Sequence, residues 1–218
     1  MIKVAILEDH QGIIDGYTLR LSESEKIKVV GVANNGEELV SLLSLHPDID
    51  VIIMDVGVPA TATSNSPIPI LNYVPKLLAN KSNLSILVIS MLTQQILVKA
   101  LVGAGVSGYI FKHDGNSIRN LAAIVRSIAN GGTYFSEEAL EKLDAAKLNR
   151  EGNTLTVRQL EIISLCAAFP DLSTDQLAKK SNIASSTFRN LLSEAYERLN
   201  VHNRAAAIER ARTLGLIS

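Results

Sequence analysis

Five side chains suited to phosphoryl chemistry stand at the carboxyl ends of short apolar runs that we predict to be strands. They are Glu8 and Asp9 after KVAIL (3–7), Asp55 after VIIM (51–54), Ser90 in ILVIS (86–90) and Lys112 in GYIFK (108–112). In a parallel sheet these ends converge on one edge. Three carboxylates there repel one another unless a cation neutralises them, and carboxylate oxygens with water are the ligands that Mg²⁺ prefers. A hydroxyl and an ammonium beside such a metal suit the oxygens of a phosphoryl group.

Each of these residues alone has an ordinary structural explanation. An aspartate after a strand is usually a turn residue, a serine there is a local cap, and a single lysine is a solvated charge. Five such residues at the ends of four strands favour one joint site.

The elements that must position these residues alternate along the first 130 residues. KVVGVA (28–33) is a fifth strand candidate, and helical periods cover about 11–22, 36–45, 70–80, 94–102 and 117–130. Continuous apolar runs of this length are typical of parallel strands buried on both faces. We therefore predict an α/β fold with a doubly wound, five-stranded parallel sheet. Asn35 with Glu38 has the spacing of an N-terminal helix cap.

The stretch GAGVSGYIFK contains a G-x-G-x-x-G pattern at Gly103, Gly105 and Gly108. A dinucleotide fingerprint needs its glycines directly after a strand and at the start of a helix. Here they follow a helical stretch and precede a strand, and no acid follows between Asp114 and Glu137. The pattern indicates a helix stop and excludes a dinucleotide site.

The character of the chain changes near residue 131. Residues 131–153 read as a polar linker with a short helix, and no strand is evident after Leu155. Capping-box spacings at Thr156 with Gln159 and at Ser173 with Gln176, and Asn203 before an Ala-rich stretch, mark helix starts. We predict a first domain at 1–130, a linker at 131–153 and a small all-α domain at 154–218.

The composition indicates the cellular compartment of the protein but says little about its binding partners. Residues 1–149 carry 12 basic and 15 acidic side chains and residues 150–218 carry 9 and 7, so the charge asymmetry is mild. The longest apolar runs are far too short for a membrane span. The single cysteine, Cys166, lies in an apolar stretch and reads as a buried structural thiol. We expect a cytoplasmic protein with no membrane association.

The stretches ILEDH, IIMDVGVP, VISM and GYIFK resemble the receiver domain of two-component response regulators, a CheY-like fold. The resemblance implies that Asp55 is the phosphoacceptor. It implies that Asp9, Asp55 and the carbonyl of Gly57 hold Mg²⁺, with Glu8 acting directly or through water. Lys112 and Ser90 would bind phosphoryl oxygens, and Tyr109 would swing inward when Ser90 moves. The loop at 57–70 is a few residues longer than is usual in the family, and we expect an irregular entry into the third helix. His113, which stands where a proline or an acid is common, is expected to be solvated.

Residues 155–217 resemble the DNA-binding domain of LuxR/NarL-type regulators. A short helix at about 174–181, a turn at Asn182–Ile183 and a longer helix at about 186–199 form a helix-turn-helix whose second helix would enter the major groove. Phe188, Leu191, Leu192, Ala195 and Leu199 recur at helical spacing and predict its buried face. The residues that we expect to contact DNA are Ser185, Ser186, Thr187, Arg189, Asn190, Ser193 and Arg198. Helix 204–213 is a candidate dimer contact or an internally packed helix.

Together these features imply a response regulator transcription factor. A partner histidine kinase would phosphorylate Asp55, which would free the helical domain or favour a homodimer and so control sequence-specific binding to double-stranded DNA. One alternative is an atypical regulator that a protein or ligand controls without phosphorylation, which the 57–70 loop favours. A phosphatase would need an acid where this chain has Gly57, so we expect no enzyme beyond slow Mg²⁺-dependent self-dephosphorylation. A helical interaction module without DNA affinity is the alternative for the second domain, since its charge is low.

Overall fold

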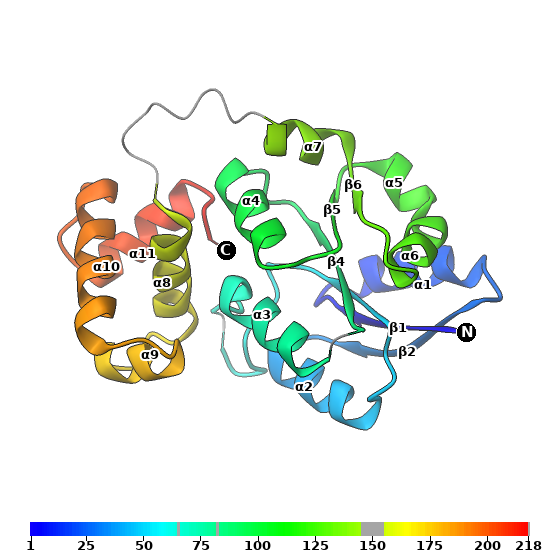
Figure 1. The fold of residues 1–218 in the computed structure, drawn as a ribbon, viewed down its shortest axis with the longest axis horizontal. Helices are drawn as coiled ribbons and strands as arrows, with labels where there is room; N and C mark the ends of the chain where they lie inside the picture. The colour runs from blue at the N-terminus through cyan, green and yellow to red at the C-terminus, as the bar shows by residue number, and fades with distance from the viewer. Residues whose placement is uncertain (65, 82, 145–154, 218) are drawn as a thin grey trace.

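A computed structural model describes residues 1–218 apart from 65, 82, 145–154 and 218 (Figure 1). Two parts follow one another: an α/β domain from β1 to α7, and a helical domain from α8 to Ile217. The described part of the α/β domain holds one sheet of six parallel strands in the order β2-β1-β3-β4-β5-β6. The strands are β1 (Ile2–Leu7), β2 (Ile27–Ala33), β3 (Val51–Met54), β4 (Ser85–Ser90), β5 (Gly108–Phe111) and β6 (Tyr134–Phe135).

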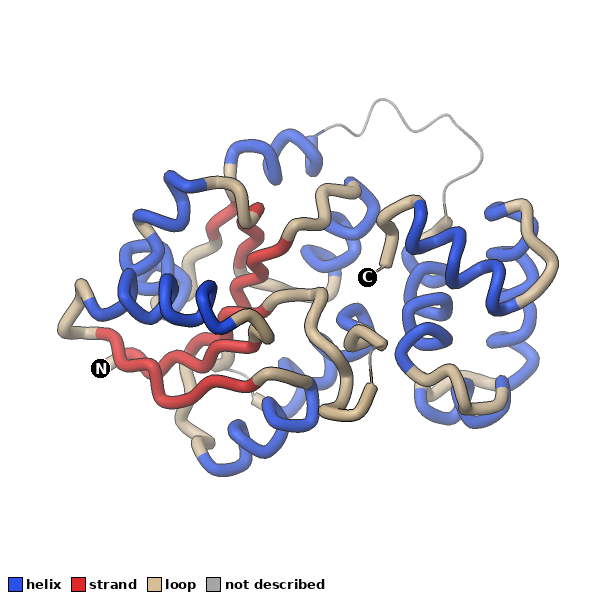
Figure 2. The backbone as a smooth tube through the Cα atoms, turned by 180° about the vertical axis from the view of Figure 1, so that it is seen from behind, coloured by secondary structure: helices blue, strands red, loops and turns tan. Residues whose placement is uncertain are grey.

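Helices cover both faces of this sheet (Figures 1 and 2). α1 (Gln11–Ser22), α5 (Gly115–Arg119) and α6 (Leu121–Ala129) lie on one face, and α2 (Gly36–Leu45), α3 (Ile70–Asn80) and α4 (Gln95–Gly103) lie on the other. Alternate residues of β1 belong to the two cores: Val4 and Ile6 pack with α1 and α6, whereas Ala5 and Leu7 pack with α2, α3 and α4. Burial on both faces explains why the strands are continuous apolar runs.

The predicted α/β class is confirmed, with two differences in detail. The sheet gains a sixth strand, β6, from residues that we expected to be linker. It is only two residues long, and two glycines precede it, so it carries little strand signal. The helix predicted at 117–130 is two helices that meet at Asn120, and the first begins at Gly115 because the Asp114 carboxylate accepts hydrogen bonds from the amides of Asn116 and Ser117. The last part of the expected linker, 145–153, lies outside the described residues.

Two of the three glycines, Gly105 and Gly108, have structural roles. α4 ends at Gly103, and Gly105 has a φ of +99°, the left-handed conformation that commonly follows a helix. Gly108 begins β5, where a Cβ would lie 2.5 Å from the Tyr134 carbonyl oxygen and 2.8 Å from the Leu87 side chain. The helix stop predicted from the sequence is confirmed, and Gly108 is needed for the close approach of β5 to its neighbours.

The helical domain consists, over its described residues, of α8 (Val157–Ala168), α9 (Thr174–Lys180), α10 (Ser185–Leu199) and α11 (Arg204–Thr213), while α7 (Glu137–Asp144) precedes it. The predicted capping boxes at Thr156 and Ser173 are both formed, and Asn203 caps α11. The turn between α9 and α10 passes through Asn182 with a φ of 57°. Cys166 is buried, as expected, and burial raises the pKa of its thiol to about 11.

The helical domain packs on the α/β domain through α8 and the segment that follows α11. These elements lie against α3 and α4, whereas α10 packs on α8, α9 and α11 at the side away from the sheet (Figures 1 and 2). One polar contact across the interface joins the Lys76 ammonium of α3 to the carbonyl oxygen of Lys180 in α9, at 3.1 Å. None of the helices that the structure describes is both long enough and apolar enough to cross a membrane.

Alanine substitutions test the structural roles of the glycines. Gly108→Ala should lower the free energy of unfolding by about 1–3 kcal/mol, because the added Cβ has no room. Gly105→Ala should cost about 1–2 kcal/mol because of its positive φ. Gly103→Ala should be neutral or stabilising by up to about 1 kcal/mol, since no heavy atom lies near its Cβ position. Urea unfolding measures all three, and a Gly108→Ala variant as stable as wild type would contradict the assignment.

Candidate functional site

The predicted acidic residues are positioned by main-chain hydrogen bonds that continue the sheet beyond its strands. The Glu8 amide donates to the Ala33 carbonyl at 3.0 Å, and the Asp55 amide donates to the Leu7 carbonyl at 2.9 Å. The Lys112 amide donates to the Ser90 carbonyl, also at 2.9 Å. Parallel pairing in register therefore brings residues from four strand ends to one edge, as the sequence predicted.

Lys112 is the centre of this edge. Its ammonium donates to Glu8 Oε2 at 2.7 Å and to Asp55 Oδ2 at 2.8 Å. Burial opposes the charged form of Lys112, but the two carboxylates outweigh it and raise the pKa of the lysine above its ordinary value. Glu8 is 1% exposed and Asp55 9% exposed, so their charges need this partner.

Asp9 lies at the open side of the edge. The structure pairs its carboxylate with His10 Nδ1 at 2.8 Å, and the same nitrogen lies 3.1 Å from Glu8 Oε1. The hydrogen bond to Glu8 and the charge of Asp9 raise the pKa of His10. Glu8, Asp9 and His10 form a cluster of possible metal ligands that does not include Asp55. The side chains of Asp9 and Asp55, which we expected to share a metal, thus have different partners here.

The donor set at this edge nevertheless fits Mg²⁺. The edge holds three carboxylates, of which Glu8 and Asp55 contact Lys112 and Asp9 does not, and all three offer the oxygen ligands that this ion takes. The main chain of Gly57 runs beside the Asp55 carboxylate, since a Cβ on Gly57 would lie 3.4 Å from Asp55 Oδ2. A carbonyl ligand from residue 57 is therefore compatible with the local backbone.

Ser90 and Tyr109 are joined through the main chain of Leu92. Ser90 Oγ accepts a hydrogen bond from the Leu92 amide at 3.0 Å, and the Tyr109 hydroxyl donates to the Leu92 carbonyl at 2.6 Å. The Tyr109 ring is fully buried, and burial raises the pKa of its phenol. The ring that we expected to swing inward on activation already lies inside.

The long loop after Asp55 is folded back on itself. Pro59 and Pro67 form an antiparallel bridge, and the Ile68 amide donates to the Val58 carbonyl at 2.9 Å. Pro69 precedes α3 without a side-chain cap, which agrees with the irregular entry expected there. His113 is exposed, as expected, and its side chain pairs with Glu138 at 2.8 Å and stacks on Phe111.

The predicted buried face of α10 is confirmed. Phe188, Leu192, Ala195 and Leu199 are buried, and Leu191 is partly buried. The predicted contact residues lie off this face: Ser186, Thr187, Arg189, Asn190 and Ser193 are exposed, and Ser185 and Arg198 are partly exposed. Arg189 pairs with Asp175 of α9 at 2.7 Å. The N-cap residue Ala184 makes no side-chain cap bond.

Sequence reasoning missed three participants. His10 could have been suspected because it directly follows two acids of the site. Asp175 gave a weaker signal, since its pairing with Arg189 depends on how α9 and α10 cross. Leu92 gave no signal in the sequence. An apolar residue after a strand is common, and the role of Leu92 lies in hydrogen bonds of its main chain.

Comparisons with known proteins agree with both parts of the fold. The model of the response regulator receiver domain matches residues 4–125, and that of the luxR family of bacterial regulatory proteins matches 153–211. An uncharacterised transcriptional regulatory protein of Bacillus subtilis, YvfU, is 31% identical over 218 residues and covers all of both chains. The transcriptional regulatory protein DesR of the same organism is 28% identical, over 99% of this chain and 98% of its own.

Solved structures give the same result for the fold. The response regulator ChrA of a heme-sensing two-component system has a TM-score of 0.51 at 28% identity, over 99% of this chain and 98% of its own. RcsB of Salmonella enterica serovar Typhimurium, bound to promoter rprA with phosphomimetic BeF₃⁻, has a TM-score of 0.66 at 19% identity, over 96% and 97% of the two chains.

The buried lysine predicts how stability responds to substitution and pH. Lys112→Met should lower the free energy of unfolding by about 2–4 kcal/mol, because two carboxylates lose their partner. Adding Glu8→Gln should restore part of this loss. Because the native pKa of Lys112 is raised, its contribution is present below the unfolded value of about 10.4 and is lost as pH rises through the native value.

Urea unfolding at pH 7 and across the alkaline range measures these effects. Lys26→Met, in an exposed turn, is the control that removes the same charge. Equal stability of the Lys112 and Lys26 variants at pH 7 would refute the pairing.

Proposed function

The chain belongs to the response regulators that join a receiver domain to a luxR-family regulatory domain, and we propose that Asp55 is the phosphoacceptor through which it is controlled. The protein is a transcription regulator of this family. The observation that supports Asp55 is its place at one sheet edge with Lys112, Glu8 and Ser90, where its carboxylate pairs with the Lys112 ammonium.

The proposed step transfers one phosphoryl group. An oxygen of the Asp55 carboxylate attacks the phosphorus of a phosphohistidine on a partner kinase, and an acyl phosphate forms. The P–N bond breaks, and its electron pair stays on the imidazole nitrogen of the kinase, which then takes a proton. Lys112, already 2.8 Å from Asp55 Oδ2, would pair with a phosphoryl oxygen, and Ser90 would donate its hydroxyl proton to another.

Mg²⁺ would be held by Asp9, Asp55 and the Gly57 carbonyl, with Glu8 directly or through water. When bound, it would neutralise the charge that develops on the phosphoryl oxygens. Lys112 would keep its contact with Glu8, so that the buried carboxylate stays paired throughout. Beyond this step we expect at most slow self-dephosphorylation. We propose that the protein works in the cytoplasm, where the kinase and DNA are both accessible.

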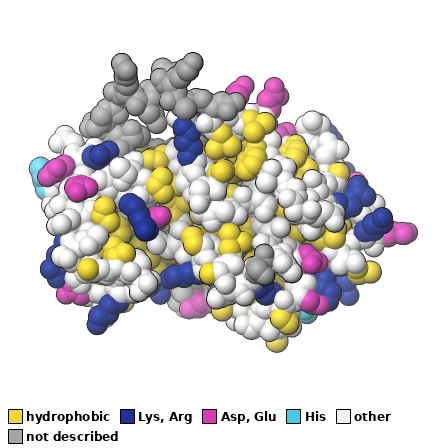
Figure 3. Space-filling view, viewed as in Figure 1, with side chains coloured by type: hydrophobic (Ala, Val, Ile, Leu, Met, Phe, Trp, Pro, Cys, Tyr) yellow, Lys and Arg dark blue, Asp and Glu magenta, His cyan; other side chains and the backbone are white. Residues whose placement is uncertain are grey.

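The helical domain would bind double-stranded DNA through α10. Its outer side presents Arg189 and Asn190, side chains suited to guanine and adenine, beside three hydroxyl residues at the start of the helix. Lys and Arg are interspersed with acids on the face in Figure 3, rather than gathered over this domain. One copy should therefore bind weakly, and a homodimer on two half-sites should bind tightly. RcsB has been solved as dimers bound to DNA, which supports this arrangement.

A phosphorylation-independent regulator is the second candidate. In the structure Lys112 pairs with both carboxylates, and the Tyr109 ring lies inside the domain. A receiver that holds this arrangement permanently would respond to a protein or ligand instead.

Intact-protein mass after incubation with acetyl phosphate and Mg²⁺ tests the acceptor. Wild type should gain one phosphoryl group, and Asp55→Asn should gain none, because the acceptor oxygen is lost. Asp48→Asn, an exposed aspartate at the far end of the sheet, is the matched control and should be phosphorylated like wild type. A wild-type chain without adduct, beside a receiver that reacts, would favour the second candidate.

Selection from a random-sequence duplex library, followed by affinity measurements on single-base variants of the selected site, tests α10. Arg189→Ala should remove about 1–3 kcal/mol of discrimination at one base pair. Arg158→Ala, which removes an exposed arginine from α8, should leave base preference unchanged. If Arg189→Ala instead weakens binding equally for all sequences, its contact is with phosphate and the assignment as a base reader is wrong.

A further inference from the structure

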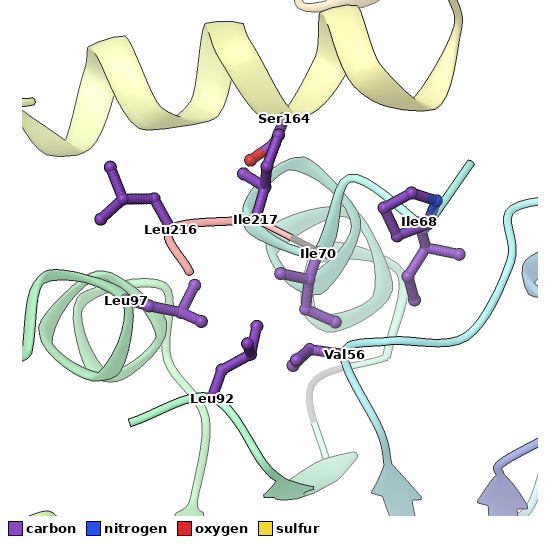
Figure 4. Close-up of a pocket in the computed structure, with 9 residues that line it drawn as sticks. Val56, Ile68, Ile70, Leu92, Leu97, Ser164, Leu216 and Ile217 are labelled. Carbon is purple, nitrogen blue, oxygen red and sulfur yellow. The ribbon is translucent and has the colours of Figure 1, made fainter. Parts of the chain in front are cut away.

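The segment that follows α11 leaves the helical domain and enters the interface between the domains. Leu216 and Ile217 lie between α8 above and α3 and α4 of the receiver below (Figure 4). Their exposed fractions are only 6% and 7%, whereas Leu214, two residues earlier, is 42% exposed. The two apolar side chains are therefore buried by the receiver together with α8.

The receiver provides an apolar seat for these side chains. It is lined by Val56, Ile68, Ile70, Leu92 and Leu97, with Ser164 of α8 at its edge. The void left among them is about 20 Å³, room for no more than a single water. The seat is thus a packed contact and has no space for a ligand.

Two further features of the receiver match the segment 215–217. Gly215 has a φ of 64°, and a Cβ there would collide with the side-chain amide of Gln94, just before α4. Ile68 and Pro67, which also line the seat, come from the long 57–70 loop, the part of the receiver that departs from the family pattern. The long loop thus contributes to the contact with the helical domain.

The seat is directly connected to the phosphoryl site. Val56 follows the acceptor Asp55 in the chain. Leu92 is held by both switch residues, since its amide donates to Ser90 Oγ at 3.0 Å and its carbonyl accepts from Tyr109 at 2.6 Å. A serine hydroxyl that turns to bind a phosphoryl oxygen must reorganise its bond with the Leu92 amide, and Leu92 is part of the seat.

We propose that residues 215–217 are a latch that fixes the orientation of the helical domain while Asp55 is unphosphorylated. Movement of Ser90 toward a phosphoryl group shifts Leu92 and opens the seat. The latch controls orientation rather than access, because α10 packs within its own domain on the side away from the receiver. Its trigger rests on the proposed function, whereas the latch itself can be tested without any phosphodonor.

Small-angle scattering and amide hydrogen exchange on the full-length chain test the latch without phosphodonor. Leu216→Ser with Ile217→Ser should increase the radius of gyration and speed exchange in α4 and α8 at least tenfold. Leu214→Ser is the matched control and should leave both unchanged. Leu92→Ala perturbs the seat from the receiver side, keeps the main-chain bonds of Leu92, and should act like the double variant. If the Leu92→Ala and double variants both stay as compact and protected as wild type, the latch is refuted.

Acetyl phosphate with Mg²⁺ then tests the trigger. Wild type should expand as the double variant does, and Asp55→Asn should not. Expansion of the latch variants together with no expansion of phosphorylated wild type would support the latch and refute its trigger. A wild type that takes up no phosphoryl group would refute the proposed acceptor, and the scattering result on the variants would still decide the latch.

DNA binding separates control of orientation from control of access. On an isolated half-site from the selected sequences, the latch variants should bind within twofold of unphosphorylated wild type. On the inverted repeat they should bind at least tenfold more tightly, because two helical domains can now align. An equal gain on the half-site would show that the receiver blocks α10 and would overturn the orientation mechanism.

Discussion

A single ammonium group between two buried carboxylates determines how the receiver can work. Lys112 reaches Glu8 and Asp55 only because parallel pairing through β4 brings the carboxyl ends of β1, β3 and β5 to one edge, so these ion pairs depend on the whole sheet. Charges removed from water need such a partner, and the sheet in turn needs the lysine to tolerate two carboxylates at one edge. The phosphoryl group that we propose on Asp55 would add negative charge beside a lysine that is already in place, so the site would be organised before the reaction.

The carboxyl edge of the sheet is also linked to the interface between the two domains. Ser90 and Tyr109 approach the same residue, Leu92, through its amide and its carbonyl. A change at either side chain therefore acts on one short piece of main chain, whose side chain packs against the helical domain. The coupling that we propose would need no long pathway, because Asp55, Ser90 and the domain interface all lie at one end of the sheet.

The sequence predicted the features that arise from local patterns. Apolar runs located the first five strands to within a residue or so, and side chains such as Asn35, Thr156 and Ser173 formed the caps that their spacing indicated. Strand order then brought the site residues together. The two-residue strand β6 has too short a pattern to detect. The pairing of Asp9 with His10 and the burial of Leu216 depend on side-chain and domain packing, which local periodicity does not carry.

Control of orientation suits the weak electrostatics of this helical domain. Residues 150–218 carry a net charge of only +2, and Glu194 and Glu197 stand on α10 itself. Because cations drive the sequence-independent part of DNA affinity, a single domain gains little from simply being exposed. Two domains held in the right relative orientation gain much more, since the second binds at high effective concentration. A contact that fixes the helical domain through residues 215–217, and leaves α10 open, would therefore regulate binding without covering the helix that we propose reads DNA.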